Sequence, residues 1–170
     1  LEESLCKWFA KKIGFNDSSG GIAASGGTLS NLNALIAARH NSGLGSDPNS
    51  VLLVSEDAHS SFIKCIRIMG LDEANLIRIK TDNNGSIDIQ NLRKTIDKCF
   101  IDNKKIFAIV ATLGTTVRGA IDPIKDISEI CKERNIWLHI DGSIGGIFAI
   151  TSIPIAVSYT HLTLPTSHCV

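Results

Sequence analysis

Four short segments of this 170-residue chain place small or polar residues in arrangements that can bind a ligand. The first is Ser25-Gly26-Gly27-Thr28, which we expect to follow a strand and to open a helix. Glycines let the backbone approach an anion closely, and the N–H groups at a helix N-terminus favour a phosphate. The alternative is a tight turn with Thr28 as a simple N-cap. Neither a dinucleotide fingerprint nor a Walker loop occurs here.

The second and third segments each follow an apolar stretch. His59 lies in Ser55–Ser61, where a strand gives way to a helix. From that point its ring can stack on an aromatic ligand and its nitrogens can reach a carboxylate or a proton, although a histidine bonded within its own loop is the alternative. The third segment, Ala111–Thr116, offers threonine hydroxyls at the end of a strand, but threonine is also a good strand former.

The fourth segment, Trp137–Ser143, carries an acid at the end of a largely apolar strand. Burying the Asp141 carboxylate is costly unless it meets a cation or hydrogen-bond donors. The protonated nitrogen of a heteroaromatic ring is such a cation, and an acid beside it lets the ring accept electrons. An aspartate that only caps the next turn is the alternative. His139, deeper along the strand, is predicted to be structural.

Hydrophobic periodicity predicts the elements that position these segments. Short apolar runs alternate with amphipathic helices, which predicts an α/β fold with a mainly parallel sheet and helices on both faces. In such sheets, ligands bind at the carboxyl ends of the strands, where the unusual residues fall. The expected strands are 51–54, 76–79, 106–111 and 136–140. The expected helices are 5–14, 29–40, 58–69, 89–99 and 124–133, with Asp122 and Pro123 as the N-cap and first turn of the last one.

The charge, the cysteine content and the apolar runs of the chain indicate which kinds of binding partner to expect. Lysine plus arginine equals aspartate plus glutamate, so charge favours neither nucleic acid nor a membrane surface, and a small-molecule ligand fits better. The five cysteines are odd in number and form no C-x-x-C pair, which is typical of a reducing compartment and predicts a cytoplasmic location without a metal site. No apolar run is long enough for a membrane-spanning helix.

In their order along the chain, the segments SGGTLSNLNALIAAR, SEDAHSSF, ATLGTTVRGAIDPI and WLHIDGSIGG resemble the group II pyridoxal-dependent amino-acid decarboxylases. The resemblance covers about Glu2–Ile150. It implies the large domain of the fold-type-I, aminotransferase-like architecture, pyridoxal 5'-phosphate as cofactor, decarboxylation of an L-amino acid and a homodimeric parent enzyme.

The same resemblance implies roles for individual residues. Gly27 and Thr28 would bind the cofactor phosphate, with Ser25 as a neighbour. His59 would stack on the cofactor ring, Thr116 would lie near it, and Asp141 would pair with the pyridine nitrogen. The remaining position, Ser143, would lie against the ring face opposite the histidine. A serine there departs from the alanine that the family often carries, which leaves the reaction preference open.

A larger departure concerns the lysine that holds the cofactor covalently. In the family it lies in an N-P-H-K segment well downstream of the H-[IV]-D motif, and no such segment occurs before Val170. We therefore expect a fragment, incomplete at both ends and inactive alone, with residues 1–155 as a partial cofactor-binding domain. Residues 156–170 resemble a translated sequencing adapter and are predicted to be non-native, with a genuine irregular tail as the alternative.

Two other functions remain open at this point. One is another fold-type-I enzyme, such as an aminotransferase or a lyase, because these share the fold and the pyridine aspartate. The other is an α/β nucleotide-binding module without catalysis.

Overall fold

Four strands form one parallel sheet in the order β2-β1-β3-β4. The computed structural model describes residues 1–150, so the predicted tail at 156–170 lies outside the described residues. β1 is buried along its whole length, as is the second half of β3, because helices cover both faces of the sheet. The strands are β1 Ser50–Ser55, β2 Leu76–Ile79, β3 Lys105–Thr112 and β4 Trp137–Asp141.

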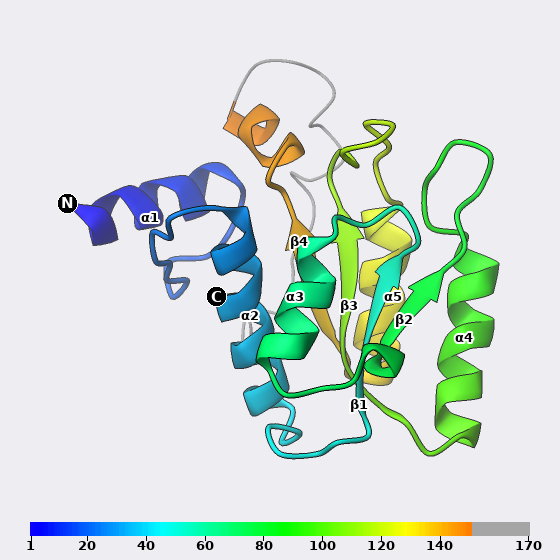
Figure 1. The fold of residues 1–170 in the computed structure, drawn as a ribbon. Coiled ribbons are helices and arrows are strands. Elements are labelled where there is room, and N and C mark those ends of the chain that lie inside the picture. Colours follow the sequence, from blue (N-terminus) through cyan, green and yellow to red (C-terminus); the bar gives the residue numbers. More distant parts are fainter. Residues whose placement is uncertain (151–170) are drawn as a thin grey trace.

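Helices pack on both faces of this sheet, which confirms the predicted fold class (Figure 1). On one face, α2 and α3 bury an apolar cluster that includes Leu35 and Phe62. On the other face, α4 and α5 bury a second cluster that includes Ile96 and Ile127. The helices are α1 Glu2–Lys12, α2 Gly27–Asn41, α3 Ser61–Ile68, α4 Ile89–Ile101 and α5 Ile124–Arg134, and two short 3₁₀ turns cover Glu73–Asn75 and Gly145–Ile150.

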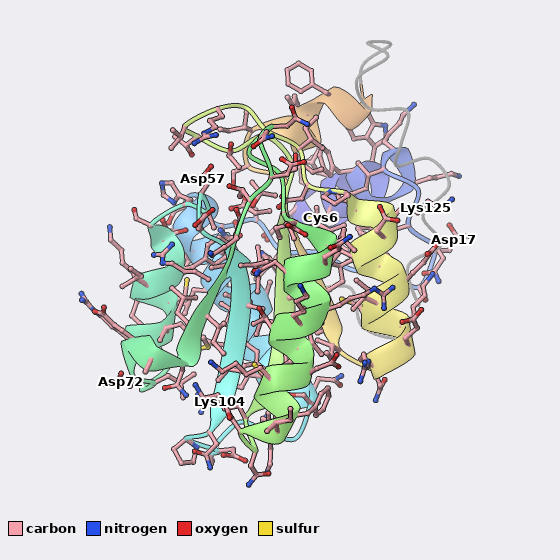
Figure 2. All side chains as sticks on the ribbon, turned by 90° about the vertical axis from the view of Figure 1, so that its right-hand side faces the viewer. Cys6, Asp17, Asp57, Asp72, Lys104 and Lys125 are labelled. Carbon is pink, nitrogen blue, oxygen red and sulfur yellow. The ribbon has the colours of Figure 1, made fainter. Side chains whose placement is uncertain are left out.

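Figure 2 looks onto the α4 and α5 side and shows side chains filling the space between helices and sheet. Lys125, at the start of α5, is exposed, as are Lys94, Lys98 and Lys132. Among the described residues, no helix has the length and apolar character needed to cross a bilayer.

Two predictions next to the cavity were wrong. No strand precedes α2, because residues 20–24 have no regular secondary structure. The helix expected from residue 58 begins only at Ser61. Residues 56–60 form a turn instead, in which the Ala58 amide donates to the Ser55 carbonyl and the Ser61 amide donates to the His59 ring. His59 therefore lies before the helix, on the turn that follows the end of β1.

The prediction that Asp122 caps α5 was also wrong. The N-cap of α5 is Pro123, without a side-chain cap. The Asp122 carboxylate instead accepts from the Ile87 amide at 2.8 Å and the Thr112 amide at 2.7 Å. Burial raises the pKa of Asp122, and these two amides lower it. Asp122 therefore fixes the carboxyl end of β3, where Thr112 lies.

A buried arginine anchors the other end of α2. Arg39 donates from Nε to Ser50 Oγ at 2.9 Å and to the Leu44 carbonyl at 3.0 Å. Its Nη1 donates to the Met69 carbonyl and its Nη2 to the Asp47 carbonyl. These bonds tie α2 to the start of β1 and the end of α3, so the first turn of α2 is held at the opposite, carboxyl edge of the sheet.

Candidate functional site

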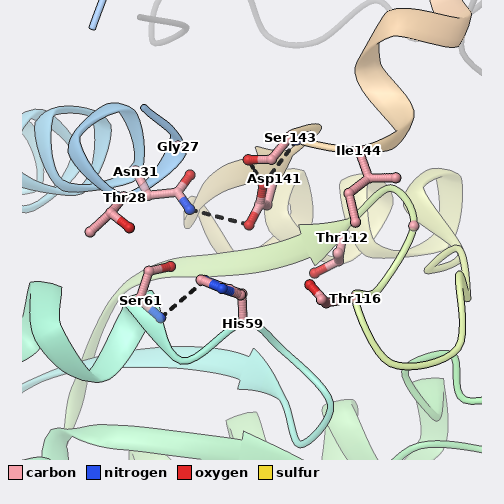
Figure 3. A pocket seen from close by; sticks show the side chains of 11 residues that line it. Gly27, Thr28, Asn31, His59, Ser61, Thr112, Thr116, Asp141, Ser143 and Ile144 are labelled. Carbon is pink, nitrogen blue, oxygen red and sulfur yellow. Dashed lines mark hydrogen bonds between the residues drawn. The ribbon is translucent and has the colours of Figure 1, made fainter. Parts of the chain in front are cut away.

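A cavity of about 260 Å³ lies at the carboxyl ends of β1, β3 and β4 (Figure 3). Its volume is close to the lower end of the usual range for small-molecule sites. Because the chain runs from β1 to β2 on one side and then to β3 on the other, the strand order reverses between β1 and β3, and ligands bind at such points in α/β sheets. The lining residues are Gly27, Thr28, Asn31, His59, Ser61, Thr112, Gly114, Thr116, Asp141, Ser143 and Ile144.

The first turn of α2 forms one wall. Gly26 is the N-cap of the helix and makes no side-chain capping bond, so the structure contradicts the simple N-cap alternative for Thr28. The amides of Gly27 and Thr28 lie in the first helical turn, where backbone N–H groups have no carbonyl partner within the helix. A Cβ atom on Gly27 would lie 2.8 Å from Ser143 Oγ, so any larger residue here would require the Ser143 hydroxyl to shift.

His59 lies on the opposite side of the cavity, on the turn before α3. Its Nδ1 accepts a hydrogen bond from the Ser61 amide at 3.2 Å. Because Nδ1 accepts, the other ring nitrogen carries the proton in the neutral form and is the donor available to a ligand. The loop therefore fixes the orientation of the ring while its side chain stays exposed and lines the cavity.

Asp141 ends β4 and is 6% exposed. Its Oδ1 accepts from Ser143 Oγ at 2.7 Å and from the Ser143 amide at 3.1 Å. Its Oδ2 accepts from Asn31 Nδ2 at 3.2 Å. Within residues 1–150 no lysine or arginine forms an ion pair with this carboxylate. Asp141 is thus a buried, hydrogen-bonded carboxylate that faces a cavity and can still accept from a cationic donor.

The loop after Asp141 packs closely on the loop after β3. The Gly145 amide donates to the Leu113 carbonyl at 2.7 Å. A Cβ atom on Gly145 would lie 2.3 Å from that carbonyl oxygen, which no side chain tolerates. This contact holds Ser143 beside Asp141 and α2.

Two lining hydroxyls are buried without a hydrogen-bond partner. They are Ser61 Oγ, on a residue that is 1% exposed, and Thr112 Oγ1, on a residue that is 5% exposed. Leaving a buried hydroxyl unpaired costs about 1–3 kcal/mol. A polar ligand in the cavity would supply the missing partners. The neighbouring Thr115 differs, because its hydroxyl accepts from the Ala120 amide.

The structure brings together the residues that the sequence predicted. Gly27, Thr28, His59, Thr116 and Asp141 all line the cavity, and so does Ser143. Ser25 does not line it.

The sequence assigned no role to five lining residues: Asn31 and Ile144, and also Ser61, Thr112 and Gly114, which lie within the predicted segments. For Asn31 a signal existed in the sequence, because it is a polar residue one helical turn after Gly27 and so lies on the same face of the helix. The structure buries this side chain. His139 is buried, as expected of a structural residue, and its Nε2 lies 3.0 Å from Asn31 Oδ1.

This set of groups suits a flat heteroaromatic ligand with an anionic tail. Amides at the start of α2 can bind the anion, the buried carboxylate can accept from a protonated ring nitrogen, and the unpaired hydroxyls of Ser61 and Thr112 can bond polar substituents. No lysine lines the cavity within the part of the chain that the structure describes. That part also contains no cluster of three or more metal-ligating side chains.

Comparisons with known proteins agree with this chemistry. The family model described as the pyridoxal-dependent decarboxylase conserved domain matches residues 1–157. The chain is 33% identical over 145 residues to the aromatic-L-amino-acid decarboxylase of Bacillus atrophaeus, covering 85% of this chain and 30% of the relative. It is 34% identical over 152 residues to the acidic amino acid decarboxylase GADL1 of Xenopus tropicalis, with the same coverage.

A solved structure gives the same relationship in three dimensions. Mouse CSAD in its apo form aligns with a TM-score of 0.84 and 29% sequence identity, covering 89% of this chain and 33% of that one. The chain therefore spans about a third of the length of the relatives that it matches, and the sheet described above is a partial fold-type-I domain. From the family match over most of its residues, this chain belongs to the pyridoxal-dependent decarboxylase family.

Proposed function

We propose that this chain is part of an enzyme that removes carbon dioxide from an L-amino acid with the help of pyridoxal 5'-phosphate bound in the cavity. One observation carries the proposal. The buried Asp141 carboxylate shares a cavity of about 260 Å³ with the first turn of α2 and with His59. Family membership supports the cofactor, and the unpaired hydroxyls of Ser61 and Thr112 support a polar ligand.

Each residue has a separate task in this proposal. The Gly27 and Thr28 amides donate to the phosphate, and the Thr28 hydroxyl is a further donor there. The His59 ring, held by the Ser61 amide, stacks on the cofactor. Asp141 accepts from the ring nitrogen and keeps the proton there, and Thr116 and Ser143 line the ring. When bound, the cofactor supplies an electron sink for the bond that breaks at the substrate's alpha carbon.

Several parts of the activity belong to residues outside this chain. We propose that the cofactor-holding lysine, the substrate specificity and the closure of the site come from the rest of the parent protein, since the chain spans about a third of its relatives. We also propose that residues 1–155 are the native partial domain and that 156–170 are not native. The family match, which ends at residue 157, supports a boundary near that point.

Assembly and location are also part of the proposal. A homodimeric parent is supported by α1, whose Leu5 and Trp8 side chains are 62% and 49% exposed although they lie on its apolar stripe. Exposed apolar side chains that are neighbours on one helix form a patch that a second subunit can cover. A cytoplasmic location is supported by the cysteines, since Cys6, Cys65, Cys99 and Cys131 are all unpaired.

The test is product analysis on the full-length gene product. Purified protein with pyridoxal phosphate is incubated with a panel of L-amino acids that includes aromatic and acidic members, because the two relatives are named for these classes. We expect carbon dioxide and the corresponding amine from at least one class. A 2-oxo acid without carbon dioxide would instead identify an aminotransferase. Failure to bind pyridoxal phosphate would reject the proposal and favour a non-catalytic module.

A further inference from the structure

A buried chain of hydrogen bonds runs from the cavity into the core. Asn31 on α2 lies between two residues of β4, with Nδ2 at 3.2 Å from Asp141 Oδ2 and Oδ1 at 3.0 Å from His139 Nε2. His139 and Asp141 are two residues apart on the strand, so both side chains point to the same face of the sheet. Figure 3 shows the Asn31 side chain reaching across to Asp141.

The chemistry of the three groups fixes the direction of these bonds. An ionised carboxylate only accepts, so the end of the Asn31 amide that faces Asp141 must be the NH₂ group. The other end is then the carbonyl oxygen, which also only accepts. His139 Nε2 must therefore carry a hydrogen and donate it to Asn31. A bare Nε2 would face the carbonyl lone pairs, or would require the amide to turn and present its oxygen to the carboxylate.

The surroundings of His139 favour this neutral, Nε2-protonated ring. Its side chain is buried, and the Phe62 ring packs against it edge-on at a centroid distance of 6.2 Å. Burial lowers the pKa of His139 to about 4, although the nearby Asp141 carboxylate acts in the opposite direction. The ring is thus a fixed donor at neutral pH. It cannot reach the cavity itself, since Asn31 lies between.

We propose that His139 and Asn31 are positioning residues for the cofactor. His139 holds the Asn31 amide in one orientation, and the amide holds the Asp141 carboxylate in position to accept from the ring nitrogen. Ser143 holds the other oxygen, Oδ1, in the same way. This inference rests on the proposed function for the identity of the ligand, but the hydrogen-bond order from His139 to Asp141 is a property of the protein alone.

The first experiment reads that property without any cofactor. Nitrogen-15 NMR of histidine-labelled full-length gene product distinguishes the two neutral tautomers and the charged ring. We expect one buried histidine in the Nε2–H form at neutral pH, assigned to His139 by its loss in His139→Gln. The exposed His40 supplies a reference signal on the same spectrum. An Nδ1–H tautomer or a charged ring at His139 would overturn the proposal.

The second experiment measures binding of pyridoxamine 5'-phosphate, which carries the same ring and phosphate but cannot form a Schiff base with a lysine. We expect Asn31→Leu and His139→Leu to weaken binding by about tenfold or more, the effect of losing a hydrogen bond in a buried charged network. His139→Gln keeps a donor at the same distance along the side chain and should restore most of the affinity. Asn33→Leu, on the same helix but outside this cavity, is the matched control.

The outcomes separate this inference from the proposed function. Wild-type protein that fails to bind pyridoxamine phosphate rejects both. Wild-type binding with unchanged affinity in Asn31→Leu and His139→Leu rejects the inference alone. Because both side chains are buried, each variant is checked by circular dichroism. If a leucine variant does not fold, the NMR tautomer and the affinity of His139→Gln still decide the matter.

Discussion

Asn31 and Asp141 are 110 residues apart in the sequence and share a buried hydrogen bond of 3.2 Å between Nδ2 and Oδ2. The bond joins the first helix of the α/β unit to the end of its edge strand, and so connects the α2 wall of the cavity to the acid at its base. The Asn31 amide therefore fixes the orientation of the Asp141 carboxylate, which also lines the cavity. The predictions below follow from that arrangement.

Replacing the acid with its amide tests the central role. In the full-length gene product, we expect Asp141→Asn to fold normally and to lower kcat by at least about a hundredfold, because a neutral amide cannot stabilise a protonated ring nitrogen. The measurement is steady-state turnover on the amino acid that the wild-type enzyme accepts, with far-ultraviolet circular dichroism to check folding. Turnover close to wild type would rule out the assigned role of Asp141.

Replacing an unpaired hydroxyl should separate stability from binding. Thr112→Val removes Oγ1 without changing the shape of the side chain, so we expect the free energy of unfolding without ligand to stay the same or to rise. Affinity for pyridoxal phosphate should fall, because the hydroxyl lines the cavity. Ser128→Ala is the matched control, since its hydroxyl is also buried and unpaired but lies outside the cavity. Equal affinities in both variants and wild type would show that Thr112 has no part in binding.

A double-mutant cycle tests the contact between the α2 wall and the acid. A Cβ atom at Gly27 would lie 2.8 Å from Ser143 Oγ, so Gly27→Ala should displace that hydroxyl and break its 2.7 Å bond to Asp141. The loss of stability should disappear in the Ser143→Ala background, with a coupling of about 0.5–3 kcal/mol. Gly20→Ala is the control, because its Cβ would meet nothing within 4 Å. Additive effects on the unfolding midpoint would contradict the predicted contact.

The buried histidine should make stability depend on pH. The pKa of His139 is about 4 in the folded protein against an ordinary value of 6.5, so between these values the unfolded state binds the extra proton. Its contribution is therefore fully present above pH 6.5 and is lost as the pH falls towards 4. At about 1.4 kcal/mol per pKa unit, the loss is of order 3 kcal/mol.

Chemical unfolding of wild type and His139→Gln across this range measures the effect. We expect a shallower dependence in the variant, which has no titrating ring at this position. Burial raises the pKa of Asp122, so that group acts in the opposite direction, but it is present in both proteins and cancels in the comparison. Parallel curves for the two proteins would mean that His139 does not titrate as proposed.

The sequence by itself determined the fold class, the order of most helices and strands and six of the eleven residues that line the cavity. Residues 51–54 and 106–111 are continuous apolar runs, which are typical of strands covered on both faces of a sheet. The structure has β1 and β3 at these positions. The residues that the sequence predicted at the strand ends line one cavity because the carboxyl ends of parallel strands meet at one edge.

Only the tertiary structure decided which polar residues serve the site and which serve the scaffold. The residues next to Asp122 predicted a helix cap, yet its carboxylate accepts from the amides of residues 87 and 112. Those partners come close to Asp122 only in the folded chain. Asn31 looked like an ordinary helix residue, yet it joins Asp141 to His139. The sequence predicts helices and strands because their hydrophobic periods are set by residues a few positions apart. A hydrogen bond between residues 110 positions apart forms only after the sheet and its covering helices have assembled.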